Sequence, residues 1–338
     1  MNAATLLLAL ALTPAAAQDG SAAGFGPVLG FGPKTGYGVL LLAYDVDAEW
    51  ERELGSLRLG IKGHAVESAQ CLNIDEAVDV LAMQSALDRF RGQRVGKIVG
   101  VPLETIDDSP RMQQTRYLFG VRQDPVSETP DPEKSSMRPL RPRTRSSLLL
   151  EPDVPRPHRL SSRVPLVLAP TLGSSPVLVD ILADRAKALA LAPKREAVVL
   201  AGIAPRSDDE RKAWIEQARA IAEAVRAKAG FREAAVAALR DGVNSSQQDS
   251  DRRELRQTFR GLARSGAITV VPLSPSAARV KQLLDKNPPG PFYRWNGKGI
   301  LGDARLLQWI KAAAAEAAKL PDGRKYKDST MNTLGDLP

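Results

Sequence analysis

KIVGVPL at residues 97–103 and ITVVPL at residues 268–273 are two copies of one pattern. In each, a short run rich in apolar and β-branched residues ends in Val-Pro-Leu, which is typical of a strand buried on both faces of a parallel sheet. A similar run precedes each copy, VLLL at residues 39–42 and VVL at residues 198–200. Each of these runs is followed by a polar, helix-like segment. A pattern that recurs in the same order predicts an internal duplication.

Working outward from these runs, strands alternate with helices along the chain. The predicted strands are 39–42, 66–72, 95–103, 164–168, 198–200, 234–239 and 268–273, and the predicted helices include 47–58, 75–91, 177–191, a long one opening at 207, and 249–264. Both copies end in a Leu-Gly turn, Leu172-Gly173 and Leu301-Gly302, followed by an amphipathic segment. Alternation of this kind predicts an α/β fold with right-handed crossovers. We expect two tandem units, each a four-stranded parallel sheet flanked by helices.

The 338 residues are enough for about two domains. We expect a first domain over residues 37–192, interrupted by an insertion at 122–162, and a second over 193–320. A segment at 18–36 and a tail at 321–338 flank them.

The amino terminus resembles an export signal. An apolar run at Leu6–Leu12 is followed by Ala15-Ala16-Ala17, a small-residue cleavage pattern. We therefore expect a signal peptide at residues 1–17 and a periplasmic or secreted product; the alternative is a disordered, Ala-rich start of a cytoplasmic protein. The run is too short to span a bilayer, and no later segment is long and apolar enough, so we expect no stable membrane insertion. Cys71 is the single cysteine, which excludes an intramolecular disulfide.

The formal charge of +8 is concentrated in one region. Seven arginines and only two acidic residues lie between Arg138 and Arg163. This part of the insertion is rich in Pro, Ser and Arg, so a solvated segment is favoured over an arm for an anionic partner. Aromatic residues make up only 5% of the chain, which argues against stacking on single-stranded nucleic acid. We expect no nucleic-acid partner.

Three ordered features resemble one family. VVLAG at residues 198–202 continues through Arg206, the central strand ends in VPL, and a turn reads LAPTLGSSP at residues 168–176. Together they resemble the class II tetrapyrrole chelatases, in particular the sirohydrochlorin cobaltochelatase and ferrochelatase type, over residues 38–320 apart from the insertion. The resemblance implies insertion of cobalt or iron into a tetrapyrrole, in a cleft at the carboxyl ends of the strands. In this family histidines accept the pyrrole protons and hold the metal, a role suited to neutral imidazole.

The family's histidines are absent from this sequence. Its Gly-His-Gly-Ser-Arg pattern is matched by Gly202–Arg206 with Ile203 in the histidine place, and Tyr44 occupies that place in the first unit. The second histidine is missing from both 104–112 and 274–281. The histidines present, His64 and His158, are expected at the start of a strand and in the insertion, with structural or surface roles.

Carboxylates and basic side chains remain as site candidates. The candidate metal ligands at strand-end loops are Asp45, Glu104, Asp107 and Asp108, while helix capping is favoured for Asp47, Asp208 and Asp209. Oxygen ligands would suit a hard cation better than cobalt. The candidate anion-binding residues are Arg206, Arg279, Arg294 and Lys298. For each of them taken singly, an ordinary charged surface position is the simpler interpretation.

No phosphate-binding loop, dinucleotide fingerprint or Cys-x-x-Cys pair is found, and neither histidine has a nucleophile motif beside it. Two functions stay open. The first is an exported sirohydrochlorin cobaltochelatase-like protein that handles a divalent metal or a tetrapyrrole at a degenerate site, with carboxylates or Tyr44 as ligands. The second is a non-catalytic periplasmic binding protein for an anionic small molecule or a protein partner.

Overall fold

A computed structural model describes residues 36–44, 48–71, 77–93, 95–126 and 158–328. The expected signal peptide, nearly all of the 18–36 segment, Asp45, Asp47, residues 127–157 of the insertion and residues 329–338 of the tail lie outside these ranges.

The first sheet has the strand order β2-β1-β3-β4, and all its strands are parallel. Its chain segment contains β1 (Tyr37–Ala43), α1 (Ala48–Gly60), β2 (Ala65–Gln70), α2 (Ala77–Arg89), β3 (Lys97–Pro102), α3 (Pro110–Leu118), β4 (Leu166–Leu168) and α5 (Pro176–Lys187). We call this sheet and the helices that pack on it the first half.

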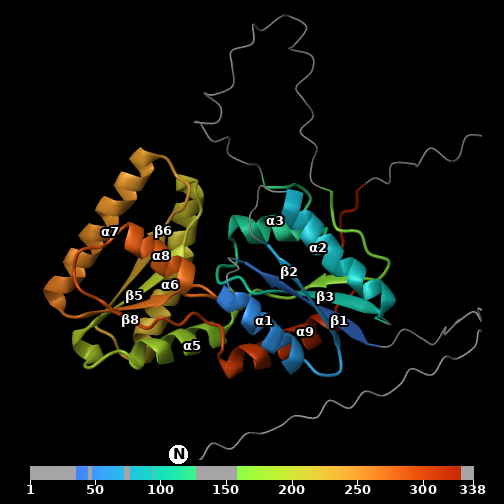
Figure 1. The fold of residues 1–338 in the computed structure, drawn as a ribbon, viewed down its shortest axis with the longest axis horizontal. Coiled ribbons are helices and arrows are strands. Elements are labelled where there is room, and N and C mark those ends of the chain that lie inside the picture. Colours follow the sequence, from blue (N-terminus) through green and yellow to red (C-terminus); the bar gives the residue numbers. More distant parts are fainter. Residues whose placement is uncertain (1–35, 45–47, 72–76, 94, 127–157, 329–338) are drawn as a thin grey trace, which may run out of the picture. The chain divides into compact units, whose positions relative to one another are not determined.

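The second sheet repeats this order as β6-β5-β7-β8, again all parallel (Figure 1). Its chain segment contains β5 (Ala197–Ile203), α6 (Asp208–Ala229), β6 (Glu233–Leu239), α7 (Ser245–Ser265), β7 (Ile268–Pro272), α8 (Ala278–Lys286), β8 (Arg294–Trp295) and α9 (Ala304–Lys319). This sheet and the helices that pack on it form the second half. The expected fold, two four-stranded parallel sheets flanked by helices, is confirmed.

Three elements were not predicted. Helix α3 follows β3 directly, with Ser109 as its N-cap, Pro110 in its first turn and the Ser109 side chain accepting a hydrogen bond from the Met112 N–H. Helix α8 occupies the equivalent place after β7. Strand β8 has only two residues, Arg294 and Trp295, too few to show a periodic pattern.

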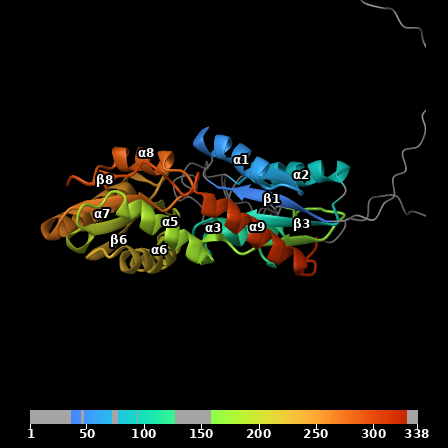
Figure 2. The same cartoon turned by 90° about the horizontal axis from the view of Figure 1, so that it is seen from below.

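The last helix of each chain segment packs on the sheet of the other segment. Helix α5 follows β4 in the chain but contacts α6 and β7, whereas α9 follows β8 but contacts β3 and β4 (Figures 1 and 2). Segments 37–192 and 193–320 therefore each contain one sheet, but each sheet is covered in part by a helix from the other segment.

This exchange produces a hydrophobic core that both halves share. Successive residues of β1 point to opposite faces, so Val39 and Leu41 join the shared core while Leu40 and Leu42 pack with α2 and α3. The shared core continues from α1 and α9 through α5 and α6 to the second sheet. A separate cluster beneath α7 and α8 covers the outer face of that sheet.

The described ends of the insertion and of the tail pack on the first half. Arg159 pairs with Asp328 at 2.6 Å and lies 4.5 Å from the centre of the Tyr117 ring. The Gly323 N–H donates to the Leu166 carbonyl. No helix in the described ranges is long and apolar enough to cross a membrane.

Candidate functional site

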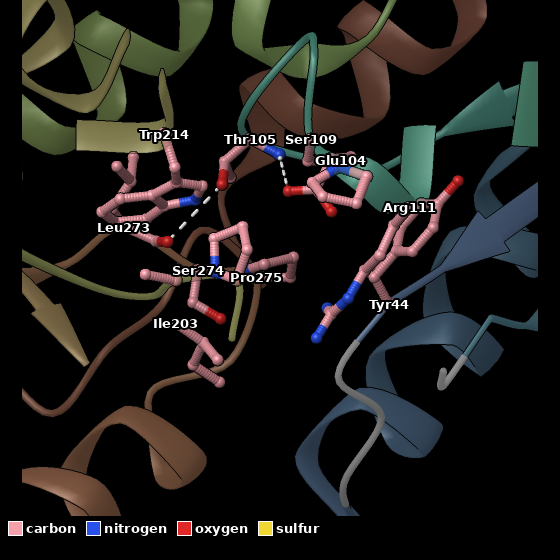
Figure 3. Close-up of a pocket in the computed structure, with 13 residues that line it drawn as sticks. Tyr44, Glu104, Thr105, Ser109, Arg111, Ile203, Trp214, Leu273, Ser274 and Pro275 are labelled. Atoms are coloured by element: carbon pink, nitrogen blue, oxygen red, sulfur yellow. Dashed lines mark hydrogen bonds between the residues drawn. The ribbon is translucent and has the colours of Figure 1, made fainter. Parts of the chain in front are cut away.

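A cleft of about 60 Å³ lies at the carboxyl ends of the central strands (Figure 3). Its walls come from residues 104–105 and 109–111 after β3, 203–205 at the end of β5 and 273–275 after β7, together with Tyr44 after β1 and Trp214 of α6. Ligands of open parallel sheets bind at this edge. Two hydrogen bonds join the halves here, from Thr105 Oγ1 to the Leu273 carbonyl at 3.5 Å and from the Asp108 N–H to Gln217 Oε1 at 3.3 Å.

The segments in which the resemblance implies histidines all contribute to this cleft. Tyr44 and Ile203 both line it, one from each half. Glu104 and Ser274, which open the two segments after the Val-Pro-Leu strands, line it as well. The duplication therefore brings the four corresponding segments to one place, although none supplies a histidine.

Tyr44 is held as a neutral phenol. Its hydroxyl is 2.9 Å from Thr115 Oγ1 and 3.5 Å from the Met112 sulfur, and Figure 3 shows it directed away from the cleft. Burial, with a smaller contribution from Cys71, raises the pKa of Tyr44 well above its ordinary value of 10.0. A phenol in this environment does not supply an anionic metal ligand at neutral pH.

Two of the candidate carboxylates, those of Glu104 and Asp108, have separate partners. Glu104 Oε1 accepts hydrogen bonds from the N–H groups of Thr105 and Ile106 at 2.9 and 3.4 Å, so it caps its own loop. Asp108 pairs with Arg116 at 2.7 Å. Burial raises the pKa of Asp107, against the lowering effect of Arg116.

No group of three His, Cys, Asp or Glu side chains that could hold a metal is present in the described part of the chain. Asp45 lies outside it, so Glu104, Asp107 and Asp108 do not by themselves form the expected oxygen-ligand site.

The four basic candidates do not line the cleft. Arg206 donates to the Asp241 carbonyl and Arg279 pairs with the Asp241 carboxylate, so these two meet beside the strand ends. Arg294 instead pairs with Glu196 at the start of β5, at the amino-terminal edge of the sheet. The backbone N–H of Lys298 donates to Asn296 Oδ1.

Of the candidate helix caps, Asp208 and Asp209 lie in the first turn of α6, as expected from their sequence position. Asp208 pairs with the buried side chain of Arg240, and Asp209 pairs with Lys212 at 3.1 Å. The side chain of the N-cap residue, Ser207, makes no capping hydrogen bond.

The basic residue that does line the cleft is Arg111, which the sequence did not single out. Ser109, Pro110 and Arg111 form the start of α3 and all line the cleft. Figure 3 shows Ser109 and Arg111 at its wall. A helix amino terminus carries partial positive charge, which adds to that of the guanidinium. Only the pair Ser109-Pro110, an N-cap residue followed by a first-turn proline, could have revealed this helix start from sequence.

Ser274, from the second half, lines the same cleft. Its side chain is 3% exposed, and its hydroxyl has no hydrogen-bond partner in the described ranges. Leaving a buried hydroxyl unsatisfied costs about 1–3 kcal/mol, so a polar group that enters the cleft can recover this energy. Nothing in the sequence around residue 274 marks this serine.

A larger hollow of about 400 Å³ adjoins the cleft. It shares Ser109, Pro110 and Trp214 with the cleft and is otherwise lined by residues that include Gln113 and Arg122. A ligand whose charged end lies in the cleft therefore has room for its remaining atoms beside α3 and α6.

The sequence matches no protein-family model and no curated protein. It is similar, at low identity, to several solved structures. The chain of Bacillus subtilis SirB, solved with Fe3+, is 14% identical, with a TM-score of 0.48 over 85% of this chain and 99% of that one. DR2241 of Deinococcus radiodurans, described as a multi-domain protein structurally similar to chelatases, is 14% identical, with a TM-score of 0.46 over 86% of this chain and 57% of that one. An ABC transporter solute-binding protein of Mycobacterium smegmatis, solved with glycerol, is 11% identical, with a TM-score of 0.34 over 87% of this chain and 90% of that one.

Proposed function

We propose that the protein is a non-catalytic binding protein that holds the oxyanion group of a small molecule, a carboxylate or a phosphate, in the cleft between its halves. One observation carries the proposal: the buried hydroxyl of Ser274, which has no hydrogen-bond partner among the described residues, lies in the same cleft as Arg111 and the start of α3. A hydroxyl donor, a guanidinium and a helix amino terminus are together suited to an oxyanion. Since they come from both halves, the bound anion would join the two halves.

The chemistry of the other lining groups favours binding over metal insertion. Insertion requires a base for the pyrrole protons and ligands for the metal. Tyr44 is a buried neutral phenol, and Glu104 is hydrogen-bonded to its own loop. A binding role needs neither a free base nor a set of three metal ligands.

Calorimetric titration of the full chain with phosphate, acetate and succinate tests the proposal and separates phosphate from carboxylate ligands. We expect Ser274→Ala to weaken binding of the preferred anion about tenfold, the effect of losing one hydrogen bond to a charged group. The matched control is Thr269→Val, which removes another buried hydroxyl that has no partner in the described ranges and does not line the cleft. Equal affinities for the wild type and both variants, or no binding of any anion, would overturn the proposal.

A second candidate is the handling of a tetrapyrrole and its metal, cobalt or iron, as substrate or cargo. It is favoured by the meeting of the four corresponding strand-end segments in one cleft. Pockets for drug-sized ligands measure about 300–1,000 Å³, so the cleft would have to open to admit a macrocycle. Absorbance spectra of sirohydrochlorin with the protein, recorded with and without Co2+ or Fe2+, test this candidate. Metal-dependent change faster than without protein supports insertion, and a spectral shift without metal supports a carrier.

We also propose that the protein is exported to the periplasm or secreted. The apolar run at Leu6–Leu12 followed by Ala15-Ala16-Ala17 supports this. Expression of the full sequence, cell fractionation and amino-terminal sequencing of the product test it; recovery in the cytoplasm with residues 1–17 attached would overturn it.

A further inference from the structure

The solvent-facing side of α7 carries a stripe of four arginines: Arg253, Arg256, Arg260 and Arg264. Spacings of three and four residues place them on one helix face. The opposite face, with Leu255, Phe259 and Leu262, is buried against the second sheet. At 1.5 Å per residue the stripe is about 16 Å long.

Carboxylates in the described ranges do not neutralise the charge of this arginine stripe. Arg253, Arg260 and Arg264 are exposed and have no ion-pair partner in the described ranges, whereas Arg252 on the next helix face pairs with Asp249. Glu254, the only acidic residue between 252 and 265, pairs with Arg211 of α6. Within the part of the chain that the structure describes, the stripe therefore presents three guanidinium groups without an ion-pair partner to the solvent.

The loop at residues 287–293 runs beside this helix. Arg252 donates to Asn287 Oδ1 at 3.3 Å, Arg256 donates to the Pro288 carbonyl at 3.3 Å, and the rings of Phe259 and Tyr293 are 5.7 Å apart. Phe292, the neighbour of Tyr293, is 88% exposed. Because this loop contains three prolines, at 288, 289 and 291, it holds Phe292 in place at a low further cost in conformational entropy.

We propose that the arginine stripe and Phe292 together form a docking surface for an anionic phospholipid bilayer. Arginine forks match phosphate oxygens, and a cluster of four or more basic side chains on an amphipathic helix is typical of surfaces that bind anionic lipids. Phe292 would enter the interfacial layer, while no helix in the described part of the chain is suited to cross it. A bilayer is favoured over an acidic protein, because a lone protruding phenylalanine suits a fluid interface that needs no complementary pocket. This inference does not depend on the ligand of the cleft.

Sedimentation of the full chain with vesicles tests the proposal. We expect binding to phosphatidylglycerol–phosphatidylcholine vesicles that weakens with added salt, and little binding to vesicles of phosphatidylcholine alone. The triple variant Arg253→Gln, Arg260→Gln, Arg264→Gln should bind these vesicles about a hundredfold more weakly, because the loss of each arginine lowers the affinity about fivefold. Phe292→Ser should weaken binding about tenfold even at high salt, because its contribution is apolar.

A matched control removes three positive charges from the exposed face of α6, as Lys212→Gln, Arg219→Gln and Arg226→Gln. It should bind vesicles nearly as well as the wild type. Equal loss in the control and stripe variants, or no binding of the wild type to anionic vesicles, would overturn the proposal. Release of the wild type from vesicles by a small amount of polyglutamate or of single-stranded DNA would overturn it in favour of that class of partner.

Discussion

Arg294 Nη1 lies 2.7 Å from Glu196 Oε2 and ties the two-residue edge strand β8 to the start of the central strand β5. Glu196 is nearly fully buried, and its other carboxylate oxygen accepts the N–H groups of Leu191 and Ala192 at 3.0 and 2.8 Å. Burial acts to raise the pKa of Glu196, but these N–H groups and the Arg294 guanidinium outweigh it and lower the pKa below its ordinary value of 4.5.

Glu196→Gln should lower the free energy of unfolding at neutral pH by about 1.5–3 kcal/mol, since it removes hydrogen bonds to a charged group. A carboxylate whose pKa is depressed on folding contributes stability above its unfolded pKa, and this contribution is lost as the pH falls through the folded pKa. The difference in the free energy of unfolding between the wild type and Glu196→Gln should therefore be smaller at about pH 3 than at neutral pH. Urea unfolding of both proteins at the two pH values measures this, and equal losses would refute the assignment.

Tyr44→Phe should lower the free energy of unfolding at neutral pH by about 1 kcal/mol, the value of one hydrogen bond. The effect is small because the Thr115 hydroxyl keeps its hydrogen bond to the Arg111 carbonyl, at 2.8 Å, when the Tyr44 hydroxyl is removed. The pKa of Tyr44 is raised on folding, so its contribution is present below the unfolded pKa of 10.0 and is lost as the pH rises above it. The wild type should lose stability above about pH 10 more steeply than the variant. Urea unfolding across this alkaline range tests the prediction, and parallel pH profiles would contradict it.

Ile310→Ala tests the helix exchange. Ile310 of α9 is fully buried, so its truncation should cost about 2–5 kcal/mol. Because α9 packs on β3 and β4, amide hydrogen exchange should accelerate first in the first sheet. The matched variant Ile181→Ala in α5 should accelerate exchange first in the second sheet. The reverse pattern would show that each helix belongs to the sheet of its own chain segment.

Arg240 is 3% exposed at its side chain and pairs with Asp208 and Asp251. Arg240→Met should cost about 3–5 kcal/mol, because it leaves the Asp251 carboxylate partly buried without this partner. The pKa of Asp208 should rise toward 3.8, since the hydrogen bond from Arg240 is the main cause of its lowering. Urea unfolding and a carboxyl-carbon NMR titration measure the two effects. The control Asp209→Asn removes an exposed pair with Lys212 and should cost under about 1 kcal/mol; an equal loss in both variants would refute the assignment.

Much of the fold could be predicted from sequence, because buried parallel strands such as residues 97–103 and 268–273 are continuous apolar runs. The helix exchange could not, since α5 and α9 are both amphipathic and periodicity does not say which sheet a helix covers. Arg294 was expected at the cleft, yet its two-residue strand starts at the opposite edge of the sheet. The start of α3 could be predicted from Ser109-Pro110. The burial of the Ser274 hydroxyl without a partner in the described ranges could not, because it depends on contacts between distant segments.

The most direct test of the cleft as a binding site is a backbone amide NMR titration of the full chain with the anion that calorimetry selects. We expect simultaneous shifts after both Val-Pro-Leu strands, at Thr105 and Arg111 in the first half and at residue 274 in the second, and in Ser274→Ala the same shifts should need about tenfold more anion. Shifts confined to the surface around Arg206 and Arg279, or shifts in one half alone, would contradict it.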